Sequence, residues 1–312
     1  MANLYLAFEV VFPILTYMMV GFAATKLNVW DAETSAKVNK LIFVSFLPIL
    51  LYENIRGINM DQGIDYRLTI YAVASVLITY GLLFIIIPMI EKDNNRRGVM
   101  IQGIYRSNYI IIGVPMTQTI LGQENIGFTA ALIGVIIPIF NILAIIAMEI
   151  YRDSHVHWGR IVKNVVKNPF VIATFFGFGV LLSGIRLPSF IDTATVAMGR
   201  TATPIALAAM GGCFRFGGAK NCLKQLIISV SGKLVCMPAI WLTVAALLGF
   251  RGHAFVSLMS LYGAPVAVSS YSIAQQMGGD SELASQIVVY TSVFSILTLF
   301  LVTFITKSLG LY

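Results

Sequence analysis

The chain has 312 residues, of which 58% are hydrophobic and only 11% are charged. Soluble domains carry about 25% charged residues, so this composition excludes a water-soluble globular protein and indicates a membrane protein. The net charge of +7 comes from Lys and Arg in short clusters between apolar runs, without a basic recognition module, which excludes a nucleic-acid partner. The three cysteines have no CxxC spacing and predict neither a metal site nor a redox site.

Hydropathy predicts ten membrane-spanning helices, because each apolar run is long enough to cross a hydrocarbon core about 30 Å thick. The first run has no basic segment before it and is followed by Lys26, which favours a retained span over a cleaved signal peptide. The ten predicted spans are residues 4–24, 37–55, 67–90, 98–121, 125–151, 168–185, 191–213, 223–248, 252–277 and 283–306.

The loops between these spans differ in positive charge, which predicts the orientation in the membrane. One set of alternate loops and span ends holds only five Lys and Arg residues: Arg56, Arg67, Arg186, Arg251 and Lys307. The other set holds thirteen: Lys26, Lys37, Lys40, Lys92, Arg96, Arg97, Arg152, Arg160, Lys163, Lys167, Arg215, Lys220 and Lys224. Because cytoplasmic loops retain positive charge, we expect a multi-pass plasma-membrane protein with the thirteen in the cytoplasm and both termini outside.

The spacing of the prolines indicates an internal repeat. Pro13 and Pro48 are 35 residues apart, as are Pro169 and Pro204; Pro88 and Pro115 are 27 apart, as are Pro238 and Pro265. The interval between the pairs is 40 residues in the first half and 34 in the second, so one loop difference of six residues aligns the two halves. A shared P-x7-G-F pattern starting at the first proline of each half supports this alignment.

The repeat divides the chain into residues 1–151, a basic cytoplasmic linker at 152–167 and residues 168–312. Each half contains five predicted spans, an odd number, so the second half enters the membrane in the opposite sense and the repeat is inverted. His155 and His157 lie in the linker; without Cys or carboxylate neighbours, this pair is interpreted as part of a solvated loop and not as a metal site.

The fourth and ninth spans have the features of broken helices. Gly113 and Pro115 interrupt the fourth span, and Gly263 and Pro265 interrupt the ninth at the equivalent repeat position. A single Gly-x-Pro is ordinarily a kink, but a matched pair favours a binding site at the membrane midplane. Polar residues surround both interruptions, and the predicted site includes Arg106, Ser107, Asn108, Tyr109, Ser269 and Ser270.

Three cations lie deep inside predicted spans: Arg106, Arg200 and Lys233. Carboxylates are scarce near the centres of the spans, so this excess of positive charge favours an anionic ligand. A structural role for Lys233 and Arg200 stays open, because a buried cation can also bond to helix-end carbonyls that a proline leaves unpaired.

The segment from Arg106 to Pro115, with the sequence RSNYIIIGVP, resembles the N-x4-G-x-P signature of the auxin efflux carrier family, especially its bacterial malate or malonate permeases. The resemblance extends over essentially the whole chain, including Gly263-Ala264-Pro265. It implies ten helices in two inverted repeats, with Asn108 bonding a carboxylate ligand and Pro115 and Pro265 marking the crossover. Plant members carry other residues where this chain has Val266, Ala267, Ser269 and Ser270, which disfavours auxin as the substrate.

These observations favour a secondary transporter of a small organic anion, a mono- or dicarboxylate such as malate or malonate, in a lipid bilayer. A sodium-coupled symporter of the bile acid type and a non-transporting membrane sensor are the alternatives. No H-E-x-x-H or G-x-S-x-G motif occurs in the spans, so no enzyme is predicted, and no cofactor or metal. The coupling ion (H+ or Na+) and homodimer formation stay open.

Overall fold

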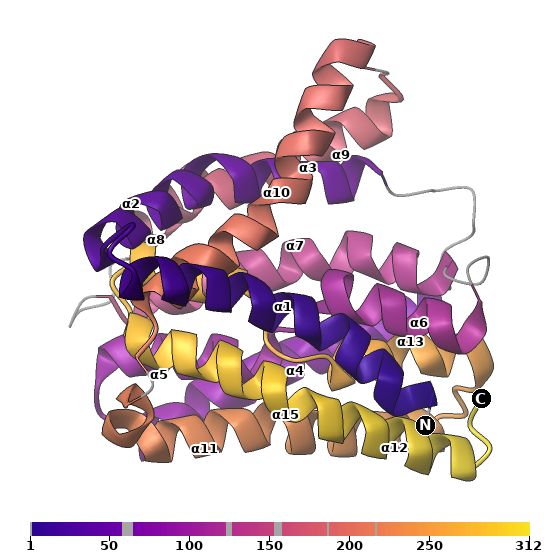
Figure 1. Ribbon diagram of the computed structural model, residues 1–312. Helices are drawn as coiled ribbons and strands as arrows, with labels where there is room; N and C mark the ends of the chain where they lie inside the picture. Colours follow the sequence, from indigo (N-terminus) through magenta and orange to yellow (C-terminus); the bar gives the residue numbers. More distant parts are fainter. Residues whose placement is uncertain (1, 58–64, 123–126, 153–157, 186, 216) are drawn as a thin grey trace.

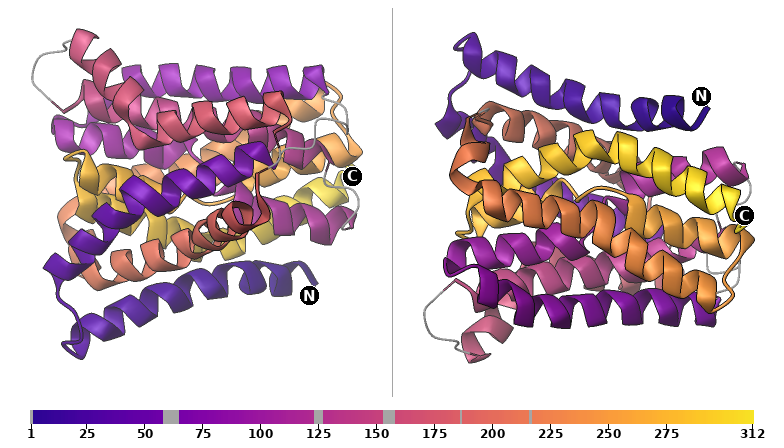
Figure 2. Two further views of the ribbon diagram at one scale, coloured as in Figure 1. Left: turned by 90° about the horizontal axis from the view of Figure 1, so that it is seen from above. Right: turned by 90° about the horizontal axis from the view of Figure 1, so that it is seen from below.

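The computed structural model describes residues 2–57, 65–122, 127–152, 158–185, 187–215 and 217–312, and side chains for these except 2–11 and 32 (Figure 1). The described chain is helical, with no β-strand in these ranges. His155 and His157 lie outside the described residues. The helices form two bundles that lie side by side, as the three ribbon views show (Figures 1 and 2).

The small bundle is made from two separate parts of the sequence. Its elements are α1 (Ala2–Lys26), α2 (Ala32–Leu41), the π-helical turn η1 (Ile42–Phe46), α3 (Leu47–Arg56), α9 (Pro169–Ser183) and α10 (Ser189–Cys213). Helix α1 packs against α10, and α3 packs against α9. The α1–α10 contact depends on Gly21 and Gly211: a Cβ at Gly21 would lie 1.8 Å from the Ala208 carbonyl oxygen, and one at Gly211 would lie 2.0 Å from the Met18 carbonyl oxygen. Small residues let helix backbones approach closely in membranes.

The large bundle contains most of the remaining helices. Its elements are α4 (Tyr66–Ile90), α5 (Asn94–Tyr105), η3 (Tyr109–Gly113), α6 (Val114–Leu121), α7 (Gly127–Ile150), η4 (Gly218–Cys222), α11 (Leu223–Ser231), η5 (Gly232–Cys236), α12 (Met237–Leu247), α13 (Gly252–Gly263), α14 (Ser269–Gln276) and α15 (Ser281–Ser308). The two bundles meet where α1 packs against α15, α3 and α9 against α7, and α2 and α10 against α14.

A helix, α8 (Trp158–Lys167), occupies much of the segment that the sequence predicts as a basic linker. Trp158, Val162 and Val166 are exposed and spaced four residues apart, whereas Ile161 is buried against the protein. Because Lys and Arg alternate with these apolar residues, the mean hydropathy of the segment is low, and hydropathy alone does not predict this helix. Helix α8 meets α9 at a bend of 56° and packs against both α7 and α9.

Three of the proline residues are each preceded by a π-helical turn. Turns η1, η3 and η5 end at Phe46, Gly113 and Cys236, in each case two residues before a proline. A proline inside a helix has no N–H to donate and its ring clashes with the carbonyl four residues earlier, so a widened turn accommodates it. These helices therefore continue past Pro48, Pro115 and Pro238 instead of ending there.

Five described helices are long and apolar enough to cross a membrane, and a bent α8–α9 pair would be a sixth. The five are Glu33–Arg56, Tyr66–Ile90, Gly127–Ile150, Gly218–Leu247 and Ser281–Ser308. This is fewer than the ten predicted spans. The predicted spans 98–121 and 252–277 are each interrupted, so no piece reaches spanning length, and α10 carries Asp192 and Arg200 among several threonines.

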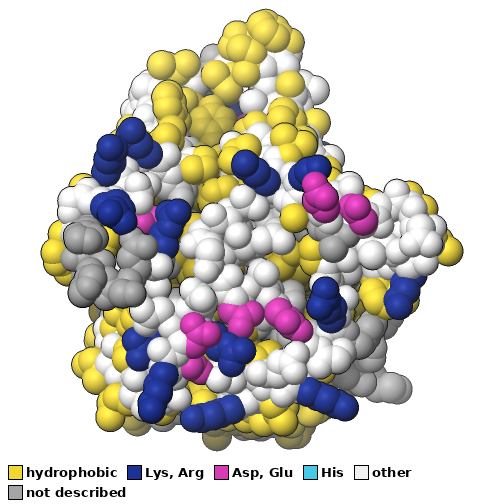
Figure 3. All heavy atoms as spheres, turned by 90° about the vertical axis from the view of Figure 1, so that its left-hand side faces the viewer, with side chains coloured by type: hydrophobic (Ala, Val, Ile, Leu, Met, Phe, Trp, Pro, Cys, Tyr) yellow, Lys and Arg dark blue, Asp and Glu magenta, His cyan; other side chains and the backbone are white. Residues whose placement is uncertain are grey.

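The surface of the molecule matches a bilayer environment. Large apolar side chains face outward along the helices, including Leu247, which is 81% exposed, and Met89, which is 79% exposed. Charged side chains gather at one end (Figure 3), where the loops before α2, α5 and α15 lie. We call this the basic end. Both chain termini lie at the opposite end (Figure 1), which we call the terminal end.

Candidate functional site

Two broken helices meet at the centre of the site. Helix α5 ends at Tyr105, and residues 106–108 are non-helical before η3 begins; helix α13 ends at Gly263, and residues 264–268 separate it from α14. The two breaks are bonded to each other, because the backbone N–H of Asn108 donates to the carbonyl of Pro265 at 2.7 Å. Each broken helix thereby satisfies a backbone group that the other leaves unpaired.

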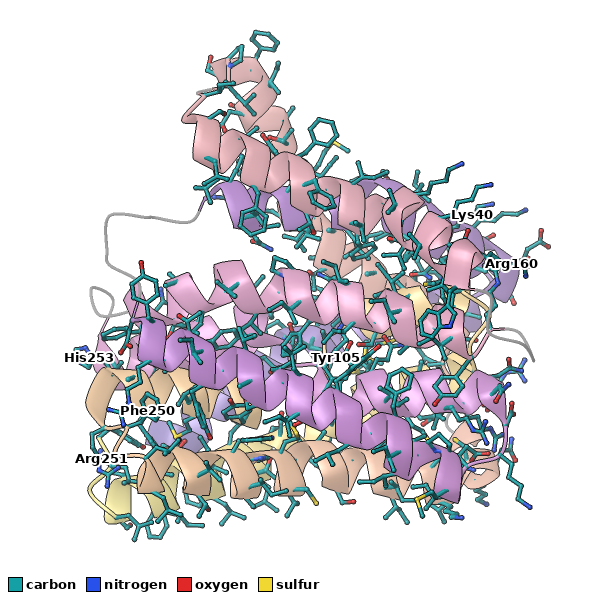
Figure 4. The ribbon with its side chains drawn as sticks, turned by 180° about the vertical axis from the view of Figure 1, so that it is seen from behind. Lys40, Tyr105, Arg160, Phe250, Arg251 and His253 are labelled. Atoms are coloured by element: carbon teal, nitrogen blue, oxygen red, sulfur yellow. The ribbon has the colours of Figure 1, made fainter. Side chains whose placement is uncertain are left out.

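The breaks lie near the middle of the molecule. Figure 4 shows Tyr105, the last residue of α5, between Arg251 and His253 at the terminal end and Lys40 and Arg160 at the basic end. The Tyr105 hydroxyl donates to the Phe140 carbonyl at 2.9 Å, which fixes the end of α5 against α7.

The predicted crossover residues are not placed symmetrically. Pro265 lies inside the second break, and the extended conformation of Ala264 (φ −64°, ψ 144°) is the one that a following proline imposes. Pro115 instead lies in the first turn of α6, seven residues past Asn108. Gly113 lies in η3, where a Cβ would come 2.4 Å from the ring of Tyr109. The first break therefore lies before the Gly-x-Pro, and its conformation depends on the contacts of residues 106–108.

A cavity of about 110 Å³ lies beside the breaks, between the two bundles. We call it the crossover cavity. The small bundle contributes Leu47, Leu50, Leu51, Asn54, Phe170, Thr203 and Ala206. The large bundle contributes residues 106–111, Ile137, Phe140, Asn141 and residues 267–269. A few polar groups in a mostly apolar wall are typical of a small-ligand site.

Arg106 supplies the positive charge of this cavity. Its side chain is only 2% exposed, and it donates to Asn141 Oδ1 at 2.7 Å, Ser269 Oγ at 2.9 Å and Gln102 Oε1 at 3.3 Å. All three acceptors are neutral, and Nε has no partner among the described residues. No described carboxylate forms an ion pair with Arg106. A buried, uncompensated guanidinium attracts an anion strongly.

Asn108 and Ser269 offer free donors beside this charge. The Asn108 side chain is buried and lines the cavity, and its Nδ2 has no partner among the described residues. Ser269 accepts from Arg106 through Oγ, so its hydroxyl hydrogen remains available. Two neutral donors and one cation on a cavity wall form a set suited to a carboxylate.

A second cavity of about 660 Å³ adjoins the first and shares the wall residues Leu50, Ile111 and Thr203 with it. It extends toward the terminal end, between α1, α6 and α10. Arg200 lines this second cavity and is exposed. The structure therefore places Arg200 beside the crossover cavity, in the wall of the adjoining cavity.

Four other predicted residues have different positions. Lys233, in η5, is completely buried, lines neither of these cavities and has no described partner for its Nζ. Ser270 does not line the crossover cavity; its carbonyl accepts from Gln102 Nε2 at 3.1 Å. Ser107 and Tyr109 line the cavity, but the Tyr109 hydroxyl donates away from it, to the Ser257 carbonyl at 3.1 Å.

The predicted set of site residues does not include Asn141 or Gln102, although both hold Arg106. Asn141 is an amide inside an otherwise apolar span. An unpaired amide costs free energy in lipid, so its presence indicates a hydrogen-bond partner within the protein. Asn54 and Thr203 lie on the facing bundle, and only the packing of that bundle brings them to the cavity.

The chain is similar to known membrane transport proteins. The model of a family described as "Membrane transport protein" matches residues 6–303. A protein of Rhizobium meliloti (strain 1021) named "Putative malonate transporter" is 22% identical over 301 residues, covering 92% of each chain. The match covers nearly the whole chain, including both broken helices, and the chain therefore belongs to this family of membrane transport proteins, the auxin efflux carrier family.

Proposed function

We propose that this protein is a secondary transporter of a small organic anion, a mono- or dicarboxylate such as malate or malonate. The carrying observation is Arg106, a buried cation bonded only to neutral groups, beside the unpaired amide donor of Asn108. Family membership and the name of the Rhizobium meliloti relative support transport and this substrate class.

In the bound state, one carboxylate oxygen accepts from Asn108 Nδ2 and the other from Ser269, within the positive field of Arg106. A second carboxylate, where the substrate has one, extends toward Arg200 in the adjoining cavity. Lys233 adds positive charge from outside the cavity wall. In this mode we expect small anions to be preferred, since apolar residues line most of the rest of the cavity.

The proposed architecture is the ten-span inverted repeat predicted from the prolines, with both termini outside the plasma membrane. The cavity lies between the two bundles, so rocking of the large bundle against the small one exposes it to each side in turn. The mutual backbone bond of Asn108 and Pro265 keeps the two breaks together within the moving bundle.

Sodium coupling is the less favoured alternative, and the reason lies in the oxygen atoms of the site. Asn141 Oδ1 and Gln102 Oε1 are the kind of ligands that a sodium ion needs, but both accept from Arg106. The guanidinium of Arg106 thus takes the place that a sodium ion would occupy between these oxygens. We expect binding without a sodium requirement, with protons or a counter-anion as the coupling species.

A ligand screen tests the substrate class. Purified protein is melted with malonate, malate, succinate, lactate or indole-3-acetate, with malonamide as a neutral control of matched size. A ligand that binds the folded state raises the melting temperature by linkage. We expect a rise with malonate and malate in sodium-free buffer and none with malonamide. Stabilisation by malonamide alone, or by cations alone, refutes the anion assignment.

A further inference from the structure

A polar contact joins the two bundles on the basic side of the crossover cavity. Asn39, on α2 of the small bundle, is completely buried and accepts from Ser272 Oγ at 2.6 Å. The Asn39 amide also donates to Gln275 Oε1 at 2.5 Å, and Gln275 Nε2 in turn donates to the Tyr271 hydroxyl at 3.0 Å. We call Asn39, Ser272 and Gln275 the α2–α14 bridge.

The position of the bridge follows from the course of α14. This half-helix begins at Ser269, which lines the crossover cavity, and runs to the basic end, where α15 begins (Figure 1). Ser272 and Gln275 follow at spacings of three residues, so they lie along one side of α14 toward the basic end. Helix α14 therefore connects Ser269, in the wall of the crossover cavity, to the bridge residues that lie closer to the basic end.

Of the two cavities that lie toward the ends of the molecule, only the one toward the terminal end shares lining residues with the crossover cavity. The cavity toward the terminal end shares three wall residues with the crossover cavity. A third cavity, about 920 Å³, lies at the basic end and is lined by Lys26, Arg215, Tyr271 and Gln275. It shares no lining residue with the crossover cavity. The bridge stands between the two, with Gln275 in the wall of the basic-end cavity.

We infer that the α2–α14 bridge is the gate that closes the binding site toward the basic end and breaks when the site opens there. This inference rests on the proposed transport function. Hydrogen bonds suit a gate, because each makes a modest net contribution that favours the closed state, and water entering from the basic-end cavity satisfies the same groups when the site opens. The structure corresponds to the state closed at the basic end.

The test measures the distance between the bundles without any ligand. Spin labels at Lys37→Cys on α2 and Lys92→Cys before α5, both exposed at the basic end, report separation by pulsed electron resonance in a background with the native cysteines replaced by alanine. Asn39→Ala removes both hydrogen bonds that Asn39 makes in the bridge. We expect the ratio of long to short distances to rise about ten-fold, the effect of losing two neutral hydrogen bonds.

Four further variants make the result decisive. Gln275→Ala breaks one of the two bonds and should give a smaller rise, and adding it to Asn39→Ala should give no further rise, because the same contact is already lost. Ser272→Ala replaces Asn39→Ala if that variant does not fold. Gln225→Ala is the matched control: it removes a bond to Glu91 at the same end, within the large bundle.

The outcomes separate this inference from the transport proposal. Unchanged distances in folded Asn39→Ala and Gln275→Ala, or an equal change in Gln225→Ala, would overturn the gate even if anion uptake is normal. The expected opening in a protein that carries no anion would support the bridge as a closing contact and refute the proposed function instead.

Discussion

Replacing Asn108 by alanine should abolish anion binding while the fold is retained. The side-chain Nδ2 has no partner among the described residues, so its removal breaks no described side-chain bond, and the backbone bond to Pro265 is kept. A hydrogen bond to a charged group contributes about 1.5–3 kcal/mol, so the malonate dissociation constant should rise roughly ten- to 150-fold. At a malonate concentration equal to the wild-type dissociation constant, the occupied fraction then falls from one half to about 9% or less.

The assay is calorimetric titration of malonate into purified wild-type and variant protein, with melting curves recorded in parallel. Asn164→Ala is the control, since Asn164 bonds Glu149 near the basic end and not the crossover cavity. We expect control affinity equal to wild type. Unchanged malonate affinity in a folded Asn108→Ala protein would refute the carboxylate site, whatever the transport rate.

Four further predictions follow from the same structure. Lys233→Met should weaken malonate binding more than it lowers the melting temperature, because the buried ammonium has no described bond to lose; the opposite order would make Lys233 structural. Arg200→Ala should weaken malonate about two- to five-fold and leave lactate unchanged, as expected for an exposed charge, and an equal loss for both would remove Arg200 from the site. Gly211→Ala should destabilise the protein by about 1–3 kcal/mol in thermal melts because its Cβ meets the α1 backbone, whereas Gly179→Ala, with open space around it, should not. The pKa of Glu91 is lowered, because bonds from the Asp93 N–H and from Gln225 outweigh the effect of its burial, which alone would raise it. A lowered pKa in the folded state stabilises above the ordinary value of 4.5, and this contribution is lost as the pH falls through the folded pKa, so Glu91→Gln should flatten the decline of the melting temperature on the acid side. A decline of equal slope in that variant would contradict this assignment.

Much of the helical fold is predictable from the sequence, because apolar runs of spanning length report directly on helices in lipid. The described helices begin and end within a few residues of most predicted boundaries; α4, predicted at 67–90, is Tyr66–Ile90. Aspartates explain several starts that hydropathy leaves vague, since Asp31, Asp65 and Asp280 each accept from a backbone N–H in the first turn.

The position of the first break is harder to predict. Gly113 and Pro115 mark a disturbance, but a π-helical turn accommodates it, and the chain leaves helical geometry at Arg106, nine residues before the proline. Arg106 is extended and Asn108 is non-helical, and the partners that hold them there, Ser269 and Pro265, lie more than 150 residues away in the sequence. A local pattern cannot encode such contacts.

Some of the predicted site residues meet at the cavity, and others do not. Arg106, Ser107, Asn108, Tyr109 and Ser269 come together at the cavity, because each lies in or next to a break. Lys233 has an equally anomalous charge in the sequence, yet the rotation of η5 directs it away from both cavities. Depth in the membrane is readable from sequence, but the direction in which a side chain points depends on tertiary packing.

The most direct test of the central claim is uptake of radiolabelled malonate into proteoliposomes by wild-type and Asn108→Ala protein in sodium-free buffer. The account predicts saturable uptake by the wild type, competition by unlabelled malate but not by malonamide, and uptake by Asn108→Ala equal to that of protein-free liposomes. Binding of malonate without uptake would indicate a sensor instead of a carrier, and uptake undiminished in Asn108→Ala would show that the substrate binds elsewhere.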